Sequence, residues 1–308
     1  MNRHLCDPQA IPAAVRLYDY LCSLQGHRCL TGQMESNWCG TQEHEINYLV
    51  MRTGRMPAIR GLDFLDNDFG GVVRRAVDWH ARGGIVTICW HTGPDFASSY
   101  PECREGELDW DAAFTPGTQA HHDLLTGLDC AVPYLQRLQQ KGIPVLWRPF
   151  HEMDGKWFWW GRGGAEGFVK LWRLMHERYT RHHGLHNLIW VLGFSDAPGD
   201  LAPWYPGDDV VDVLGGDSYQ GGAQGALYRK CAAIAPAGMP ICYHENVEIP
   251  TSQMMQEENA PWVWFMTWHT RWLTSEEFNT AGRLQEVYHD PYFVTLHALP
   301  DLITPIPE

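Results

Sequence analysis

Eight short β-rich runs with continuous apolar character recur along the chain. None shows the strict apolar–polar alternation of a strand with one solvated face. Continuous apolar character is typical of strands buried on both faces of a parallel sheet. The runs cover residues 27–33, 56–63, 84–91, 143–152, 188–195, 210–219, 239–246 and 262–269. They predict eight parallel strands.

Segments with helical spacing separate most of these predicted strands. Helices are expected over residues 70–83, 122–142 and 165–184, each ending on a glycine as helices often do. The segment 196–209 is short and rich in Pro and Gly, so its helix is expected to be weak or reduced to a turn. Strands that alternate with helices predict an α/β fold, and eight of them favour a (β/α)₈ TIM barrel. No G-x-G-x-x-G motif follows the first run, which argues against a dinucleotide-binding fold. We expect residues 1–308 to form a single catalytic domain.

Composition narrows the possible partners. The formal net charge is −14, which disfavours nucleic acid and acidic polysaccharides and favours a neutral ligand. The sequence contains 15 Trp, 12 Tyr and 11 Phe, a surplus that often lines a cleft. The sequence has neither a transmembrane run nor a signal peptide, and no Cys-x-x-Cys pair. We therefore expect a reduced, cytoplasmic monomer without a membrane partner, secreted only if an export signal has been removed.

Polar residues cluster where the predicted strands end. In a barrel of this kind, functional groups lie at the carboxyl ends of the strands. A structural protein has little reason to bring so many hydrogen-bonding groups to one rim. The residues are Gln33, Asp63, His91, His151, Glu152, Asp217, Tyr219, His244, Glu245 and His269.

Two of these residues are glutamates that end the fourth and seventh runs. Strands four and seven lie across the mouth of a barrel, so Glu152 and Glu245 are expected to face each other. Cleavage of a glycosidic bond needs such a pair, in which one carboxylic acid protonates the leaving oxygen while a carboxylate attacks the anomeric carbon. A gap of about 5–5.5 Å between the carboxyl groups indicates retention, and one of about 6.5–9.5 Å indicates inversion. Tyr219 is placed to donate a hydrogen bond to the nucleophile. This chemistry needs no cofactor and no metal.

An aromatic segment follows the first of these glutamates. Residues 157–160 are four consecutive aromatic residues, which cannot all point inward from one helix or strand. They predict an exposed patch on a loop, where indole rings would stack on the C–H faces of sugars. A protein–protein interface is the alternative.

These residues bring the chain close to a known family. The run 147–161 (WRPFHEMDGKWFWWG) closely resembles the acid/base segment of glycoside hydrolase family 26, the β-mannanases. Shorter matches follow the same order along the chain: Gly32-Gln33, Trp90-His91, residues 204–208, Asp217-Ser218-Tyr219 and Trp268-His269.

The resemblance implies a retaining (β/α)₈ glycosidase with Glu152 as acid/base and Glu245 as nucleophile, acting on β-1,4-mannosidic bonds of a neutral mannan or manno-oligosaccharide. It also implies that Tyr219 holds the nucleophile. The substrate-binding residues expected from the match and from the strand ends are Asp63, Trp90, His91, His151, Trp157, Trp160, Tyr219 and Trp268.

The sequence departs from the family pattern after the proposed nucleophile. The family usually has a glycine two residues after that Glu, whereas here Val247 occupies that position and Glu248 is a rival. Glu245 is preferred because it ends the apolar run directly. Asp154 also stands where Asn is common.

Other interpretations remain open from the sequence. The same mechanism could act on a mixed-linkage β-1,3-1,4-glucan or a β-1,3-xylan. The extra loop 94–121 could close the cleft for exo action on imported manno-oligosaccharides. The chain could also be a non-catalytic carbohydrate-binding barrel. A metal-dependent barrel would use His91, His151, His244 and His269, whereas the pairs His121-His122 and His182-His183 are expected to be surface residues.

Overall fold

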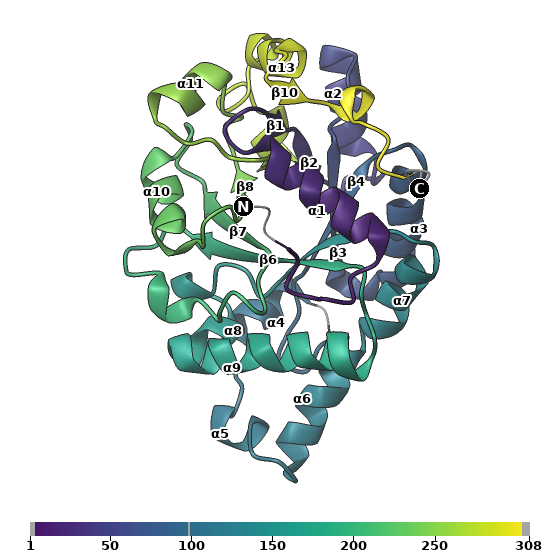
Figure 1. Cartoon of the computed structure of the whole chain (residues 1–308), viewed down its shortest axis with the longest axis vertical. Coiled ribbons are helices and arrows are strands. Elements are labelled where there is room, and N and C mark those ends of the chain that lie inside the picture. The colour runs from purple at the N-terminus through teal and green to yellow at the C-terminus, as the bar shows by residue number, and fades with distance from the viewer. Residues whose placement is uncertain (1–3, 98, 304–308) are drawn as a thin grey trace.

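The eight predicted strands form a closed parallel barrel. The computed structural model describes residues 4–97 and 99–303. The strands follow one another around the barrel in chain order, and the register Gln33↔Thr267 closes it (Figure 1). They are β2 (Gly32–Met34), β3 (Ile59–Asp63), β4 (Ile85–Trp90), β5 (Val145–Pro149), β6 (Leu188–Ser195), β7 (Val213–Ser218), β8 (Ile241–Asn246) and β9 (Phe265–Thr267). The prediction of a (β/α)₈ barrel is confirmed.

Helices surround the barrel, and two short strands lie outside it. The α-helices are α1 (Pro12–Leu24), α2 (His44–Thr53), α3 (Phe69–Ala81), α4 (Tyr100–Glu105), α5 (Trp110–Ala113), α6 (Gln119–Asp129), α7 (Val132–Gln140), α8 (Trp159–Arg162), α9 (Gly164–Glu177), α10 (Gly225–Ile234), α11 (Ser252–Glu257), α12 (Arg271–Thr274) and α13 (Ala281–His289). Single turns are η1 (Leu65–Asn67), η2 (Met153–Gly155), η3 (Arg178–His182), η4 (Ala202–Trp204) and η5 (Leu296–Ala298). Strands β1 (Cys29–Leu30) and β10 (Phe293–Val294) pair with each other.

Two of the predicted helices are divided in the structure. The segment 122–142 contains the end of α6 and all of α7, because Pro133 stands at the start of a helix and cannot continue one. In the segment 165–184 the α-helix ends at Glu177, and a π-helical turn carries the chain on to His182. Between β6 and β7 there is only the turn η4, as expected.

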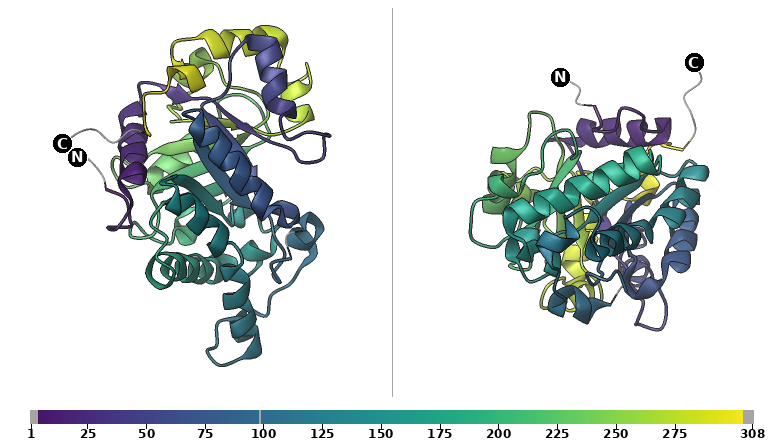
Figure 2. Two further views of the ribbon diagram at one scale, coloured as in Figure 1. Left: turned by 90° about the vertical axis from the view of Figure 1, so that its right-hand side faces the viewer. Right: turned by 90° about the horizontal axis from the view of Figure 1, so that it is seen from below.

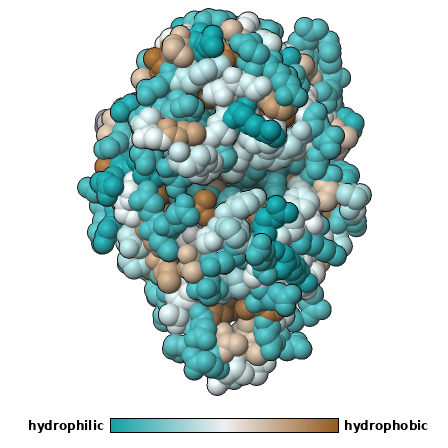
Figure 3. Space-filling view, turned by 180° about the vertical axis from the view of Figure 1, so that it is seen from behind, coloured by the Kyte–Doolittle hydropathy of each residue, from teal (hydrophilic) through white to brown (hydrophobic). Residues whose placement is uncertain are grey.

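Helix α1 closes one end of the barrel. Its buried residues Leu17, Tyr18 and Leu21 belong to the same apolar cluster as the inward-facing Ile189 and Val213 of the strands, and α1 crosses the barrel end that faces the viewer in Figure 1. This leaves the opposite end, where the strands finish, free to hold a site. Figure 3 shows that face, which is hollowed near its centre. The connection from β4 to β5 carries α5 and α6, which project away from the barrel (Figure 2).

Candidate active site

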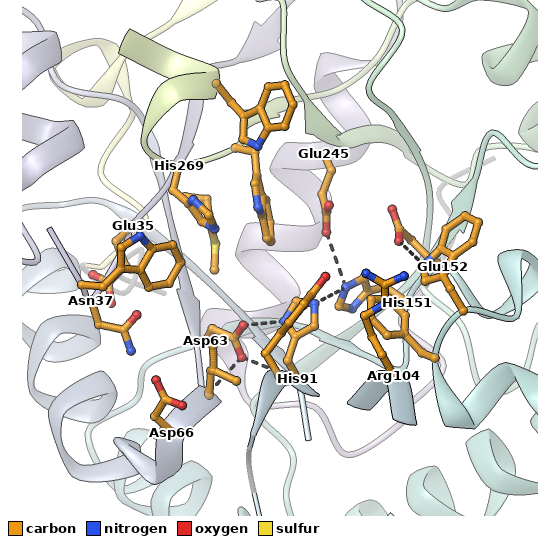
Figure 4. A pocket seen from close by; sticks show the side chains of 18 of the residues that line it. Glu35, Asn37, Asp63, Asp66, His91, Arg104, His151, Glu152, Glu245 and His269 are labelled. Carbon is orange, nitrogen blue, oxygen red and sulfur yellow. Dashed lines mark hydrogen bonds and ion pairs between the residues drawn. The ribbon is translucent and has the colours of Figure 1, made fainter. Parts of the chain in front are cut away.

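A cleft of about 790 Å³ opens at the carboxyl ends of the strands. The predicted site residues that line it are Asp63, His91, His151, Glu152, Trp157, Tyr219, Glu245 and Trp268. Their side chains come from six strand ends and converge on one space (Figure 4). The expected convergence of polar groups is therefore present.

Glu152 is held in a constrained turn directly after β5. Phe150 and Glu152 have φ values of 52° and 55°, a left-handed conformation that non-glycine residues adopt at a cost. The Glu152 backbone N–H donates to the carbonyl of Gly193 at 2.7 Å, and the Trp157 indole N–H donates to Glu152 Oε2 at 2.8 Å. Burial, and after it the charge of Glu245, raise the pKa of Glu152 to about 8. Glu152 is therefore a carboxylic acid at neutral pH.

Asp154 supports this turn. It accepts hydrogen bonds from the backbone N–H and the hydroxyl of Ser195, at 2.9 and 3.0 Å. These bonds tie the segment after β5 to the end of β6. The carboxylate that replaces the common Asn thus has a structural contact outside the cleft.

Glu245 is surrounded by hydrogen-bond donors. Arg148 Nη1 donates to Oε1 at 2.9 Å, and the Tyr219 hydroxyl donates to Oε2 at 2.8 Å. Arg148 is fully buried and also pairs with Asp217. Both carboxyl oxygens of Glu245 therefore accept a hydrogen bond, and the one from Arg148 is charge-assisted. The role foreseen for Tyr219 matches this contact.

A register shift brings Glu245 to the cleft. In the ladder, Gly216 pairs with Tyr243 but Asp217 pairs with Glu245, so one extra residue lies in β8. His244 contacts Thr87 and accepts from Trp264 inside the barrel, although its neighbour Glu245 reaches Arg148. Two consecutive side chains therefore point inward, which a regular strand does not allow.

The two glutamates face each other at short range. One carboxylate oxygen from each of Glu152, Asp217 and Glu245 lies within 4.8 Å of the others. The Arg148 guanidinium pairs with both Asp217 and Glu245. Glu152 and Glu245 thus bring one carboxyl oxygen each to within 4.8 Å of the other.

Two histidines and an aspartate form a second polar group in the cleft. His151 Nε2 lies 3.1 Å from His91 Nε2, and His91 Nδ1 lies 2.6 Å from Asp63 Oδ2. Burial raises the pKa of Asp63, but the His91 imidazole and the hydrogen bonds outweigh it, so the pKa lies below its ordinary value. Asp63 is therefore ionised.

The prediction of an exposed aromatic patch over residues 157–160 is wrong. Phe158, Trp159 and Trp160 are buried, and only Trp157 is partly exposed. The indole N–H groups of Trp159 and Trp160 donate to the carbonyls of Thr92 and His151, both at 2.7 Å. The short helix α8 thus packs its aromatic side chains under the cleft floor.

The structure does not support the prediction that Trp90 and Trp160 bind substrate. Both are fully buried and neither lines the cleft. Trp90 points outward from β4 into the layer between barrel and helices, where it packs on Phe69 and Phe96. Trp160 affects the cleft only indirectly, because its indole N–H donates a hydrogen bond to the backbone carbonyl of His151.

The rival nucleophile lies outside the cleft. Glu248 pairs with Arg283 at 2.6 Å and accepts from the Gly222 backbone N–H. The four imidazoles considered for a metal do not converge, since His244 is held by Trp264 inside the barrel. His121 and His183 have partners of their own, the Ala113 carbonyl and Asp129.

Arg148 was not foreseen; it is fully buried and does not line the cleft, but a lone cation inside an apolar strand of the long motif was a signal for a buried ion pair. Several residues that line the cleft were not foreseen either. They lie on loops and short helices, where no periodicity marks them: Glu35, Asn37, Trp38, Asp66, Tyr100, Arg104 and Trp272. Tyr100 and Arg104 come from α4, so the loop 94–121 does form part of the cleft wall. No helix in the described ranges is long and apolar enough to cross a membrane.

A parallel eight-stranded barrel with two carboxyl groups facing each other at its mouth defines the class of (β/α)₈ glycoside hydrolases. Comparison with known proteins agrees. The model of glycosyl hydrolase family 26 matches residues 6–297, and the chain belongs to this family.

Similar proteins include several that are named as mannanases. A mannan endo-1,4-beta-mannosidase of Thermothelomyces thermophilus is 33% identical over 96% of this chain and 63% of its own length. A ruminal GH26 endo-beta-1,4-mannanase structure has a TM-score of 0.89 and 29% identity, over 97% of this chain and 71% of the other. A beta-mannanase from a symbiotic protist of the termite Reticulitermes speratus, complexed with gluco-manno-oligosaccharide, has a TM-score of 0.87 and 29% identity, over 97% and 98% of the two chains. The chain spans between about half and two thirds of the length of the first curated relatives.

Proposed function

We propose that the chain is an endo-acting hydrolase of β-1,4-mannosidic bonds that retains anomeric configuration, with Glu152 as acid/base and Glu245 as nucleophile. The observation that carries this proposal is the facing pair of carboxylates, with oxygens within 4.8 Å of each other. The mannanase names of its relatives and the gluco-manno-oligosaccharide bound to one of them support the choice of substrate.

The environments of the two carboxyl groups suit two successive steps. In the first step Glu152 donates its proton to the glycosidic oxygen while Glu245 Oε2 or Oε1 bonds to the anomeric carbon and the aglycone leaves. In the second, Glu152 as carboxylate takes a proton from water, whose oxygen displaces Glu245. Esterification removes the charge of Glu245, which is one of the causes that raise the pKa of Glu152. The pKa of Glu152 therefore falls when its role changes from acid to base.

Aromatic side chains provide sugar-stacking surfaces along the cleft. Trp157 and Trp268 are partly exposed near the glutamates. Trp38 is 56% exposed at the cleft edge, where its ring meets His269 edge-on at 4.5 Å. Such surfaces bind neutral pyranose rings without needing a charge.

A substrate screen tests the proposal. We expect mannohexaose and glucomannan to be cleaved, with mannobiose and mannotriose released equally with and without EDTA, whereas mixed-linkage glucan and β-1,3-xylan stay intact. Products are identified by chromatography, and ¹H NMR of the first product should show the β-anomer. Cleavage of only the glucan or the xylan contradicts the substrate. Inactivity on all four contradicts the enzymatic role and favours a carbohydrate-binding barrel.

Removing the hydrogen bond from Trp157 should shift the pH profile. The indole N–H stabilises the ionised form of Glu152 and so lowers its pKa. In Trp157→Phe the pKa rises further, and the basic limb of kcat/KM against pH moves to higher pH because Glu152 must be protonated to act. We expect a loss of about tenfold at the optimum, as for one hydrogen bond to a charged group. Trp110→Phe, outside the cleft, is the control. A limb that stays in place or moves to lower pH would contradict this account.

A further inference from the structure

A chain of three buried side chains leads to Glu245. Asp63 ends β3, His91 follows β4 and His151 follows β5. The links measure 2.6 Å from Asp63 to His91, 3.1 Å between the two imidazoles and 3.5 Å from His151 Nε2 to Glu245 Oε1. Figure 4 shows these links as one continuous path across the cleft floor. The two rings are 4% and 1% exposed, so solvent does not determine which nitrogen carries a proton.

The Asp63 end of the chain is determined by its hydrogen bonds. Asp63 Oδ1 accepts the backbone N–H groups of Leu65 at 3.0 Å and His91 at 3.1 Å. The ionised Oδ2 can then only accept, so His91 carries a proton on Nδ1. Only one proton fits between the two Nε2 atoms, which lie 3.1 Å apart, so His91 Nε2 accepts this proton when His151 Nε2 carries it.

The His151 end of the chain of side chains indicates which ring carries the proton between the two imidazoles. Burial, together with Arg148, His91 and His244, lowers the pKa of His151 well below its usual value, so the ring is neutral and has one proton. A proton on Nδ1 would have no acceptor, because this atom has no partner among the described residues. The lone pair on Nε2 would then face the Glu245 carboxylate. Both arrangements cost free energy.

We propose that Asp63 is a positioning residue that acts through His91, holding the proton of His151 on Nε2 so that an N–H group and not a lone pair faces Glu245. This inference deepens the proposed function and rests on it for the role of Glu245. In this role Asp63 affects the reaction through His91, whether or not it also contacts the sugar.

The substitution Asp63→Asn should reverse the direction of the hydrogen bonds along the path from residue 63 to His151 without changing the positions of the side chains. The amide oxygen can still accept both backbone N–H groups, so the amide NH₂ faces His91 Nδ1. His91 then accepts at Nδ1 and carries its proton on Nε2, which moves the proton of His151 to Nδ1. We expect kcat on mannohexaose to fall about 100-fold with KM changed by less than about threefold, since a wrong tautomer alone is known to disable an Asp–His pair.

Two readouts separate this role from a structural one. In ¹⁵N spectra of ring-labelled histidine, assigned with His91→Gln and His151→Asn, the wild type should show protonated Nδ1 of His91 and Nε2 of His151, and Asp63→Asn the opposite nitrogens. Asp78→Asn on the exposed face of α3 makes the same charge change and should alter neither spectrum nor kcat. A wild-type His151 protonated on Nδ1, or an Asp63→Asn variant with wild-type kcat, would overturn the inference. The proposed function is tested separately with Glu245→Gln, and it stands if that variant is inactive. The spectra test the inference even if no mannan is cleaved.

Discussion

Replacing Glu245 with alanine is expected to lower kcat/KM on mannohexaose by on the order of 10⁵-fold, because the carboxylate that attacks the anomeric carbon is removed and the nearby Asp217 is fully buried against Arg148. The fold should persist, since Arg148 keeps Asp217 as its partner. Activity is measured with mannohexaose, and unfolding is followed by circular dichroism.

Azide distinguishes the nucleophile from the acid/base. With a 2,4-dinitrophenyl β-mannobioside, Glu245→Ala leaves a space on the α face, so added azide should give the α-mannobiosyl azide. In Glu152→Ala the covalent intermediate still forms, because this leaving group needs no proton, and azide should then give the β-azide. Proton NMR of the product identifies each anomer.

The opposite pattern of anomers would exchange the two roles. Glu248→Ala is the matched control, since Glu248 pairs with Arg283 away from the cleft. It should retain wild-type activity within about twofold and yield no azide product. A Glu248→Ala variant that loses activity and is rescued as the α-azide would assign the nucleophile to Glu248 instead.

Removing Arg148 is expected to be the most damaging change to stability near the site. Arg148 is fully buried between Asp217 and Glu245, so Arg148→Met leaves two carboxyl groups without their counterion. Breaking a buried pair from one side costs about 3–5 kcal/mol. For a domain of this size we expect Tm to fall by roughly 10 °C. We also expect kcat to fall by about 100-fold because Glu245 loses its electrostatic support.

The deficit should depend on pH in a defined direction. Burial raises the pKa of Asp217 well above its ordinary value even with Arg148 beside it, and without Arg148 we expect burial to raise the pKa of Glu245 as well and that of Asp217 further. A carboxyl group whose pKa is higher in the folded than in the unfolded chain favours unfolding once the pH rises above its unfolded-state pKa. The stability lost in Arg148→Met should therefore be smallest at acid pH and grow as the pH rises toward neutrality. Urea unfolding at several pH values measures this.

A surface pair provides the comparison. Arg173 and Asp209 are 45% and 66% exposed and pair at 2.6 Å, and Arg173→Met should change the free energy of unfolding by less than about 1 kcal/mol at every pH. Equal losses for the two variants, or a deficit at Arg148 that shrinks as pH rises, would show that the buried ion pair does not have the role assigned to it.

The strand pattern and the long motif were sufficient to predict the barrel and the two glutamates. The eight apolar runs depend on local periodicity, and each overlaps one strand of the barrel. Strand ends meet at one rim in any such barrel, so Glu152 and Glu245 could be placed across the cleft before any distance was known. Helix ends were less accurate: the Pro at 133 breaks the segment 122–142, although its terminal glycine suggested a single helix.

Predictions of side-chain exposure from neighbouring residues were wrong where burial depends on segments that are distant in the sequence. Four aromatic residues in a row indicate an exposed loop only if nothing covers them. Trp159 and Trp160 are covered because their indole N–H groups find carbonyls on the segments after β4 and β5. Trp90 precedes a cleft histidine by one position, yet strand geometry turns consecutive side chains to opposite faces and buries it.

The sequence by itself therefore determined the fold class and the position of the two glutamates on it, since these follow from periodicity and chain order. Only the tertiary structure decided how the glutamates differ. Arg148 meets Glu245 across 97 positions of the chain, and the extra residue in β8 turns both His244 and Glu245 inward. The path from Asp63 through two imidazoles likewise exists only when three strand ends are brought together. Burial and charge at these contacts depend on distances between strands, which no local pattern of residues encodes.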